Sequence, residues 1–428
     1  MDAVSGWPFS TPSSNAMARG LRILLSGMLA GDPHQGGATW AVLQYAVGLR
    51  RLGHDVYVVE PIAQRALQPE GAPLAQSANA RYFREVMARF DLTSRAALLR
   101  QETRETVGLG YGTMARAVRQ CDLLINISGM LTDPRLIESI PRRVYLDLDP
   151  AFNQLWQAVE GIDVGFDGHT HFVTVGTLIG TPACDAPVCG RTWIPTLQPV
   201  VLPEWPSTPG RPDGAWTTVG NWRGYGSIEH RGVKYGQKAH SFRRIADLPA
   251  RTRERLQPAL AIHRDEGADL AALAANNWHV VNPAVIADTP DTYRRFIQRS
   301  KGELGIAKSG YVLSRCGWFS DRSACYLASG RPVIAEDTGF GSCLPIGEGL
   351  LSFNTVEDAA AALESVAGGY GRHCRRAREI ADTFFSSDIV LRTLLERVGV
   401  ANDADSERPS DTAGAVVGAS APARGSAR

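Results

Sequence analysis

The stretch from Ser314 to Val333 contains a predicted helix whose start is suited to binding an anion. Ser320 and Asp321 are residue types that cap helix N-termini, and Asp321 also suits the positive end of the helix dipole. Gly330 ends the predicted helix. The N–H groups at Ser320, Asp321 and Arg322 can therefore hold a diphosphate. The same pattern of strand, loop, helix and strand also occurs where the helix is an ordinary part of an α/β core.

A second group of candidates follows the strand predicted at Thr217 to Gly220. Arg223, Lys234 and Lys238 lie in or just after a stretch that contains five glycines between residues 220 and 236. Glycines interleaved with cations are typical of a backbone loop that cradles phosphate. Positive charge there stabilises a diphosphate as it leaves. Each cation can equally be a solvated charge on a loop.

Ligands of parallel α/β sheets bind outside the carboxyl ends of the strands, so the polar residues at those ends are further candidates. In the second half of the chain these residues are Gly220, Asn221, Asn282, Lys308 and Ser309. In the first half, the start of the first predicted helix contributes Gly36, Gly37 and Thr39.

A general base is expected at the end of a strand in the first half of the chain. Asp147 and Asp149 flank Leu148, and strand alternation places both carboxylates on one side, where burial or mutual repulsion raises one pKa. We predict that Asp149 is the base, although it can also cap the following helix. His34, in a Gly-rich loop, and His171, at the start of a strand, are competing candidates.

Composition excludes several classes of protein. The 428 residues are 44% hydrophobic and 21% charged with a formal net charge of +1, which gives no electrostatic reason to expect nucleic-acid binding. Seven scattered cysteines do not form a disulfide framework, and Cys184 and Cys189 lack a second pair at zinc spacing, so no metal is expected. The sequence shows no signal peptide and no membrane span, and a cytoplasmic enzyme is the default interpretation.

The order of the predicted elements indicates two α/β domains. Apolar strands at 23–25, 56–59, 123–127, 144–148 and 172–175 alternate with helical stretches, and a passage rich in Pro and Trp at 194–212 interrupts the series. A second series begins at Thr217. We predict a disordered leader at 1–18, domains at 19–205 and 206–400, and a disordered tail at 401–428.

Several phrases of the sequence resemble the GT-B glycosyltransferases over residues 20 to 395. In the first half these phrases are Gly36-Gly37-Ala38-Thr39 and Leu49-Arg50-Arg51-Leu52-Gly53-His54-Asp55-Val56. In the second half, Ser314-Arg315-Cys316-Gly317-Trp318-Phe319 followed by Leu327-Ala328-Ser329-Gly330-Arg331-Pro332-Val333 is similar to the donor motif of the retaining subgroup. Gly317 and Cys325 stand where that motif has two glutamates, so the carboxylate contacts of the subgroup do not carry over.

The resemblance implies an α/β fold of two Rossmann-like, doubly wound domains that face each other across a cleft. It further implies transfer of a sugar from a nucleotide-diphosphate sugar, bound by the C-terminal domain, to an acceptor hydroxyl at the N-terminal domain. The acceptor is a small molecule, a lipid or a glycan, and no cofactor is expected beyond the nucleotide sugar as co-substrate. Whether transfer inverts or retains the anomeric configuration stays open.

Three other functions fit parts of the sequence. A nicotinamide-dependent oxidoreductase is suggested by Glu60 after the second strand, although the loop from Gly27 to Gly37 is longer than the tight dinucleotide turn. A nucleotide-sugar 2-epimerase shares the GT-B layout. A non-catalytic protein that binds nucleotide sugars is suggested by the two missing glutamates.

Overall fold

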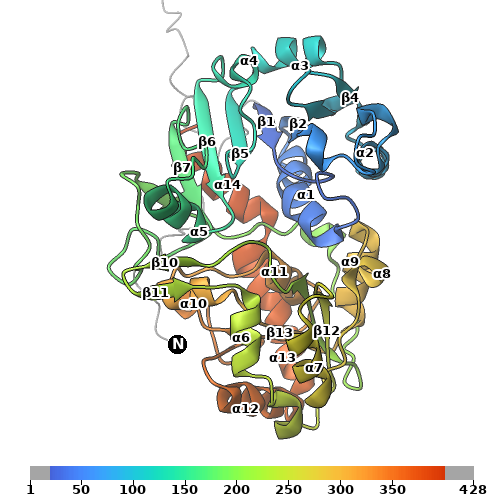
Figure 1. The fold of residues 1–428 in the computed structure, drawn as a ribbon, viewed down its shortest axis with the longest axis vertical. Coiled ribbons are helices and arrows are strands. Elements are labelled where there is room, and N and C mark those ends of the chain that lie inside the picture. The colour runs from blue at the N-terminus through green and yellow to red at the C-terminus, as the bar shows by residue number, and fades with distance from the viewer. Residues whose placement is uncertain (1–19, 401–428) are drawn as a thin grey trace, which may run out of the picture.

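The computed structural model describes residues 20 to 400, so the predicted leader and tail lie outside the described residues. The described chain forms two α/β halves. The first occupies the upper part of Figure 1 and the second the lower part. Each half is built around a sheet of mainly parallel strands. The predicted α/β fold class is thereby confirmed.

The first sheet has eight strands in the order β4-β3-β2-β1-β5-β6-β7-β8, and β4 alone runs antiparallel to its neighbour. In β1, Ile23, Leu24 and Leu25 form an uninterrupted buried apolar run, which is typical of a parallel strand covered on both faces of the sheet. The strands are β1 (Arg22–Ser26), β2 (Asp55–Ile62), β3 (Ala96–Arg100), β4 (Thr106–Gly108), β5 (Leu123–Ile127), β6 (Arg142–Asp147), β7 (His171–Thr174) and β8 (Trp193–Pro195). The helices are α1 (Gly36–Arg51), α2 (Ala78–Arg89), α3 (Tyr111–Val118), α4 (Pro134–Ile137) and α5 (Phe152–Leu155).

The second sheet has five parallel strands in the order β12-β9-β13-β14-β15. Its strands are β9 (Trp216–Asn221), β12 (Leu256–Ala261), β13 (Gly302–Gly305), β14 (Val333–Glu336) and β15 (Leu350–Phe353). The helices are α6 (Lys238–Arg244), α7 (Gly267–Ala275), α8 (Pro283–Ile286), α9 (Pro290–Arg299), α10 (Ser309–Ser314), α11 (Asp321–Ala328), α12 (Val356–Ala367), α13 (Tyr370–Ile380) and α14 (Ser387–Arg397).

The two halves are joined by two passages of the chain that run side by side. Val200 N–H donates to the carbonyl of Phe385, and Ser387 N–H donates to the carbonyl of Val200, at 2.6 and 2.9 Å. Beyond this crossing, α14 returns to the first half and packs against α1 (Figure 1). The end of the predicted 206–400 domain therefore lies on the first sheet, and the predicted boundary near residue 205 stays a prediction.

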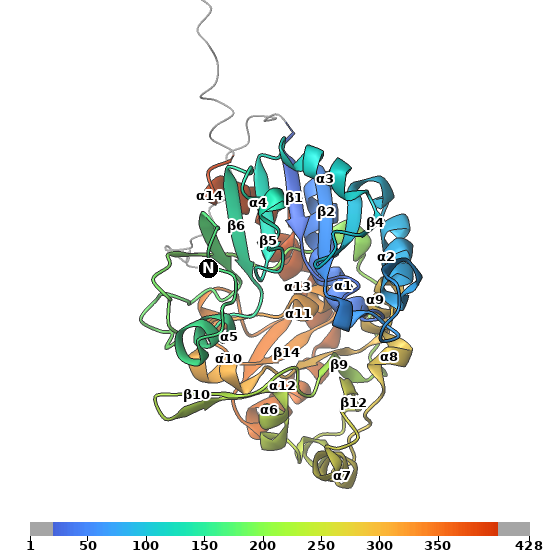
Figure 2. The same ribbon diagram turned by 45° about the horizontal axis from the view of Figure 1, so that its top comes forward.

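The second part of the stretch predicted as a phosphate-cradling loop forms a β-hairpin. Strands β10 (Ile228–His230) and β11 (Val233–Tyr235) pair antiparallel and extend to one side below α5 (Figure 2). The turn between them has positive φ at both Arg231 and Gly232, the geometry of a tight two-residue hairpin. Residues 279–282, which follow α7, form no strand of the second sheet, and one isolated bridge joins Val281 to Ala259.

None of the helices in the described part of the chain combines the length and apolarity that crossing a bilayer requires.

Candidate functional site

A cavity of about 280 Å³ lies between the two halves, at the carboxyl ends of β9 and β12. The starts of two helices, α1 and α11, face it from opposite domains. Its lining is His34, Gln35, Gly36, Gly37, Ala38, Val219, Gly220, Asn221, Ala261, Asn282, Pro283, Ala284, Ala287, Tyr293, Asp321 and Arg322. Both helix dipoles therefore direct their positive ends at one space, which favours an anionic ligand.

Two glycines let α1 approach the second domain this closely. Gly36 N–H donates to the carbonyl of Ala287 at 3.0 Å, and a Cβ on Gly36 would stand 2.2 Å from the carbonyl oxygen of Thr289. A Cβ on Gly37 would stand 2.9 Å from the ring of Tyr293. Side chains at either position would push the domains apart, so these predicted site residues fit a close contact between domains.

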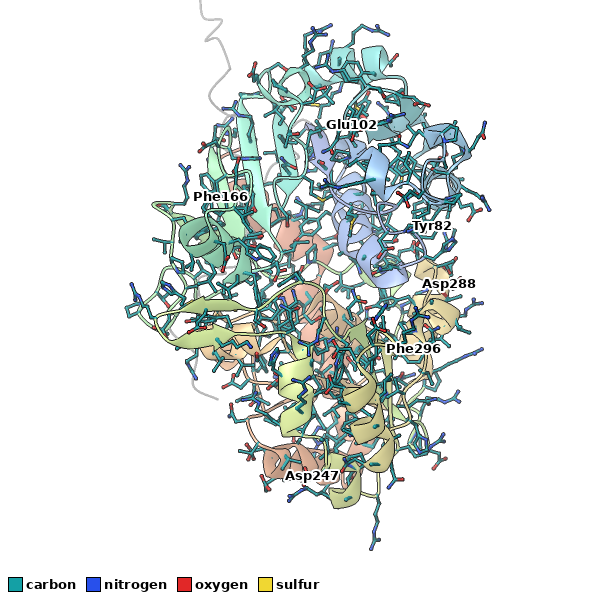
Figure 3. All side chains as sticks on the ribbon, viewed as in Figure 1. Tyr82, Glu102, Phe166, Asp247, Asp288 and Phe296 are labelled. Carbon is teal, nitrogen blue, oxygen red and sulfur yellow. The ribbon has the colours of Figure 1, made fainter. Side chains whose placement is uncertain are left out.

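The start of α1 has no side-chain cap. Gln35, which precedes the helix, makes no side-chain hydrogen bond to it. Thr39, which was predicted to face the acceptor, is instead fully buried, and its hydroxyl lies 2.8 Å from the hydroxyl of Tyr82. Tyr82 lies close to the boundary between the halves, opposite Asp288 of the second domain (Figure 3).

The predicted start of α11 is confirmed. Ser320 Oγ accepts from the N–H of Arg322 at 3.2 Å, and the helix begins at Asp321. Gly330 follows the helix in the left-handed conformation, with φ of 71°. The guanidinium of Arg322 is buried, pairs with Glu303 and donates to the carbonyl of Val219 at 2.9 Å. This network fixes a cation at the edge of the cavity.

Lys238 is a second buried cation beside the cavity. Its Nζ donates to the carbonyl of Ile306 at 2.7 Å and would lie 3.3 Å from a Cβ on Gly220, which lines the cavity. Among the described residues no carboxylate lies within salt-bridge distance of it. Burial, followed by the charge of Arg322, lowers the pKa of Lys238 well below its usual value. A buried ammonium of this kind gains most from an anionic ligand.

The other two predicted cations lie elsewhere. Arg223 pairs with Glu266. It lines a neighbouring groove of about 550 Å³ at the ends of β9 and β12, and this groove shares Asn221, Ala261 and Asn282 with the cavity. Lys234 is exposed on β11, where it lies opposite Glu229 in the strand register of the hairpin. The structure therefore does not bring Arg223, Lys234 and Lys238 together.

The remaining donor-side candidates have structural contacts. Asn282 caps α8, because its Oδ1 accepts from the N–H of Ala284 at 3.0 Å, and it also lines the cavity. Ser309 is buried at the start of α10 near Gly236. Lys308 points toward the first domain, where it meets Asp149.

The three candidate bases lie in different surroundings. His34 is exposed at the cavity, with φ of 66° and its ring 5.0 Å from that of Tyr82. Asp149 Oδ2 lies 3.0 Å from Nζ of Lys308. His171 lies at the amino end of β7, opposite Val144, on the edge of the sheet away from the cleft. That position leaves His34 as the histidine at the cavity.

Asp147 is a buried carboxylate that holds the loop after β6 in place. Asp147 accepts from Asn153, Gln154, Thr174 and the N–H of Asp149, and burial raises its pKa to about 6. The predicted raised pKa in this pair therefore belongs to Asp147, and burial is its main cause.

Glu60 fills the backbone cradle of the first Gly-rich loop. Its carboxylate accepts from the N–H groups of Ala30 and Gly31, and burial raises its pKa to about 7. An oxidoreductase of the dinucleotide-binding type would need this acidic group on a ribose. Here it binds its own loop, so the geometry disfavours that alternative.

Gly317 and Cys325, the positions that the resemblance matches to two glutamates, lie in contacts between the domains. A Cβ on Gly317 would lie 2.4 Å from Oγ1 of Thr177, and the φ of Gly317 is 72°. Leu178 N–H donates to the carbonyl of Cys316 at 3.0 Å. Cys325 is buried, and its Sγ lies 3.5 Å from Nε2 of Gln44 on α1. Both positions are therefore part of the packing between the domains.

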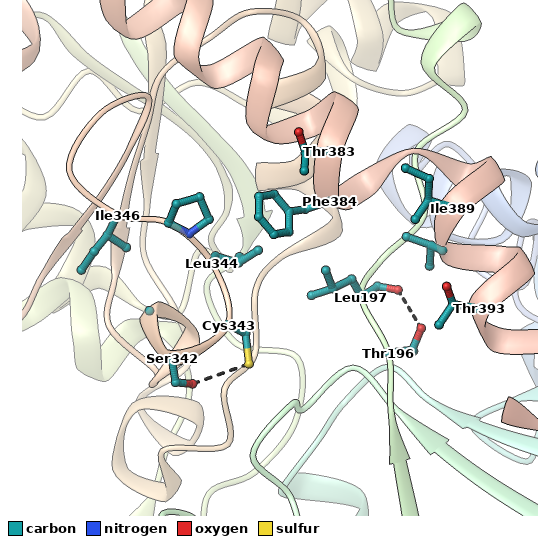
Figure 4. A pocket seen from close by; sticks show the side chains of 13 residues that line it. Thr196, Leu197, Ser342, Cys343, Leu344, Ile346, Thr383, Phe384, Ile389 and Thr393 are labelled. Carbon is teal, nitrogen blue, oxygen red and sulfur yellow. Dashed lines mark hydrogen bonds between the residues drawn. The ribbon is translucent and has the colours of Figure 1, made fainter. Parts of the chain in front are cut away.

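A larger hollow of about 540 Å³ lies near the chain crossing (Figure 4). Leu197, Leu344 and Phe384 are among its lining residues, and the polar groups there are mainly Ser and Thr hydroxyls. An apolar lining without cations does not suit a diphosphate, so this hollow is distinct from the candidate site.

Comparison with known proteins identifies the fold. No protein-family model and no curated protein sequence matches the chain. An α-glucosyltransferase solved with UDP and a 13-mer DNA is 12% identical, with a TM-score of 0.56 over 89% of this chain and 99% of the other. The Anabaena protein Alr3699/HepE, solved with UDP-glucose, is 10% identical, with a TM-score of 0.53 over 88% of this chain and 99% of the other. The chain has the GT-B fold.

At these identities the likeness shows the GT-B fold alone. The first of these structures contains DNA, so the expectation that this chain binds no nucleic acid stays a prediction.

Proposed function

We propose that this GT-B chain is a glycosyltransferase, of the hexosyltransferase type, that binds a nucleotide-diphosphate sugar in the interdomain cavity. The observation that carries the proposal is the buried Lys238 ammonium, which lies behind the cavity wall without a carboxylate partner in the described chain. With Arg322 and the start of α11, it supplies the positive charge that a diphosphate needs as it becomes the leaving group. The proposal invokes no further cofactor.

The groove next to the cavity is the proposed nucleoside site. It continues from the cavity through Asn221 and Asn282, so a diphosphate at Lys238 and Arg322 would direct its nucleoside along the ends of β9 and β12. The structural neighbours named above contained UDP or UDP-glucose, which supports a uridine nucleotide as the first to test.

The first domain is the proposed acceptor side. His34 is the candidate base that lines the cavity, and an imidazole there can take the proton of an acceptor hydroxyl. A protein base at this position fits inversion. It also fits the loss of the two carboxylates of the retaining subgroup at Gly317 and Cys325.

The test is nucleotide binding followed by donor turnover. Calorimetry with UDP, GDP and ADP should show binding of one of them, and its sugar conjugate should release free nucleotide slowly in water and faster with the right acceptor. Lys238→Met should weaken binding, whereas Lys234→Ala, on the exposed hairpin, should not. Absence of binding to every nucleotide and nucleotide sugar would refute the proposal.

A non-catalytic binding protein remains the second candidate, because the Gly317 and Cys325 positions carry no carboxylate. Tight nucleotide-sugar binding without hydrolysis, and without transfer to sugars, lipids or small-molecule alcohols, would favour it.

A further inference from the structure

Asp149 lies in a compact set of side chains that joins the two domains. Its carboxylate accepts from Lys308 Nζ at 3.1 Å through Oδ1 and 3.0 Å through Oδ2. The hydroxyls of Tyr225 and Tyr311 also donate to it, one to each oxygen. Asp149 belongs to the first domain, and its three partners belong to the second. We refer to these four residues as the Asp149 clasp.

The aromatic rings around Lys308 make the clasp more than an ion pair. Nζ of Lys308 lies 4.2 Å from the ring centre of Tyr225, and 5.1 Å from the ring centres of both Phe152 and Tyr311. Phe152 comes from α5 of the first domain, so the rings themselves cross between domains. Cation–π attraction is strongest where the cation is partly desolvated, and the Lys308 side chain is 23% exposed.

The backbone pairing at Gly317 lies beside the clasp. Gly176 and Trp318 form an antiparallel bridge between the domains, and the ring of Trp318 lies 4.5 Å from that of Tyr311. The residues at 176–178 and 316–318 therefore form, with the clasp, a continuous seam on the β13 and β14 side of the cavity.

The geometry points to a positioning role: we propose that Asp149 acts through Lys308 to hold the two domains together, and is not the group that takes the acceptor proton. A general base needs a free lone pair within about 3.2 Å of the substrate hydroxyl. Both oxygens of Asp149 already accept two hydrogen bonds each, and an ammonium is among the donors. The inference rests on the proposed function only for its consequence in turnover, because the clasp itself is measurable in the free protein.

The decisive experiment compares Asp149→Asn, Lys308→Met and the double variant in the full chain by hydrogen exchange without ligand. A clasp predicts that each single variant speeds exchange in 147–155 and 308–318 by roughly tenfold to a hundredfold, the factor that corresponds to losing a hydrogen bond to a charged group. The double variant should be close to either single one, since both remove the same interaction.

A matched control is a more exposed ion pair between the domains, Arg89 with Asp291, at 3.2 Å. Both of its side chains are more than 40% exposed, so Arg89→Met should leave exchange in the seam unchanged. Tyr311→Phe, which keeps the ring and removes one donor, tests the clasp if Asp149→Asn fails to fold.

Turnover separates the two roles of Asp149. Suppose that Asp149→Asn abolishes donor turnover but leaves hydrogen exchange in the seam at the wild-type rate, and that Lys308→Met turns the donor over like wild type. The carboxylate of Asp149 is then the base, and the clasp is wrong. If wild-type protein binds no nucleotide at all, the proposed function fails, and the exchange experiment still decides the clasp.

Discussion

Replacing Lys238 by Met gives the sharpest test of the candidate site, because it should affect binding and stability differently. The ammonium is buried, and its one hydrogen bond in the structure is to the carbonyl of Ile306. Met has a similar length and no charge. The variant therefore removes the proposed diphosphate contact while it leaves the packing nearly unchanged.

The magnitude follows from the type of contact. A hydrogen bond to a charged group contributes about 1.5 to 3 kcal/mol, so we expect UDP affinity to fall by roughly 10- to 150-fold. In the free protein the substitution has two opposing effects on stability. It removes a buried charge, which is stabilising, and it leaves the carbonyl of Ile306 without its hydrogen-bond donor, which is destabilising. The free energy of unfolding should therefore change by less than about 1 kcal/mol.

Proton uptake provides an independent readout. Burial lowers the pKa of Lys238, and a bound diphosphate raises it again, so nucleotide binding should take up a proton between the lowered pKa and about 10.5. Affinity should fall as pH rises through that window. Titration calorimetry in two buffers of different ionisation enthalpy should show the uptake in wild type and its absence in Lys238→Met.

Lys234→Ala is the matched control, since Lys234 lies on the same segment of chain but is exposed on β11. If it weakens UDP binding as much as Lys238→Met does, or if Lys238→Met binds UDP like wild type, the assignment of the diphosphate site is wrong.

Three further predictions concern other parts of the structure. Gly317→Ala should lower the free energy of unfolding, measured in urea, by about 2 to 4 kcal/mol, because Gly317 has a positive φ and its Cβ would clash with Thr177. Gly168 has a φ of 81° with open space around it, so Gly168→Ala should lower that free energy by only about 1 to 2 kcal/mol. Equal losses would contradict the interdomain contact at Gly317. Folding raises the pKa of Glu60 from 4.5 to about 7, so the contribution of its protonated form to stability is fully present below pH 4.5 and is lost as pH rises through 7. Relative to Glu60→Gln, the free energy of unfolding of the wild type should fall by about 3 kcal/mol over that range. Parallel pH profiles of the two proteins would exclude this role of Glu60. His34→Ala should slow transfer by about 100- to 10,000-fold with UDP affinity nearly unchanged, and full activity would exclude His34 as the base.

The elements that the sequence predicts well are those with a strong local pattern. The strand predicted at Leu123 to Ile127 is β5 with the same limits, because a short apolar run buried on both faces is typical of a parallel strand. The start of α11 is likewise local, set by Ser320 and Asp321. The hairpin at 228–235 was missed because its glycines were interpreted as a phosphate loop. The alternation of Ile228 to Tyr235 around Arg231-Gly232 was the available signal.

The site depends on contacts that no local pattern contains. Asp149 and Lys308 are 159 residues apart in the chain, and the contact of Thr177 with Gly317 spans 140. Sequence analysis can place each residue at a strand end, but not decide which ends meet across the cleft. It therefore identified Asp149 and Lys308 as site candidates without showing that they bind each other.

The contacts between the domains also occupy Gly317 and Cys325, the two positions that the resemblance matches to glutamates. On the β9 and β12 side the domains leave a cavity of about 280 Å³, whereas on the β13 and β14 side the seam joins them directly. Gly317 pairs with the first domain on that second side, and Cys325 lies against Gln44 of α1. A side chain at Gly317 would clash with Thr177 of the first domain, and a longer side chain at Cys325 would have to displace Gln44. Gly317, Cys325 and the Asp149 clasp are thus parts of one arrangement, in which the space beside the proposed diphosphate site is taken up by contacts between the domains.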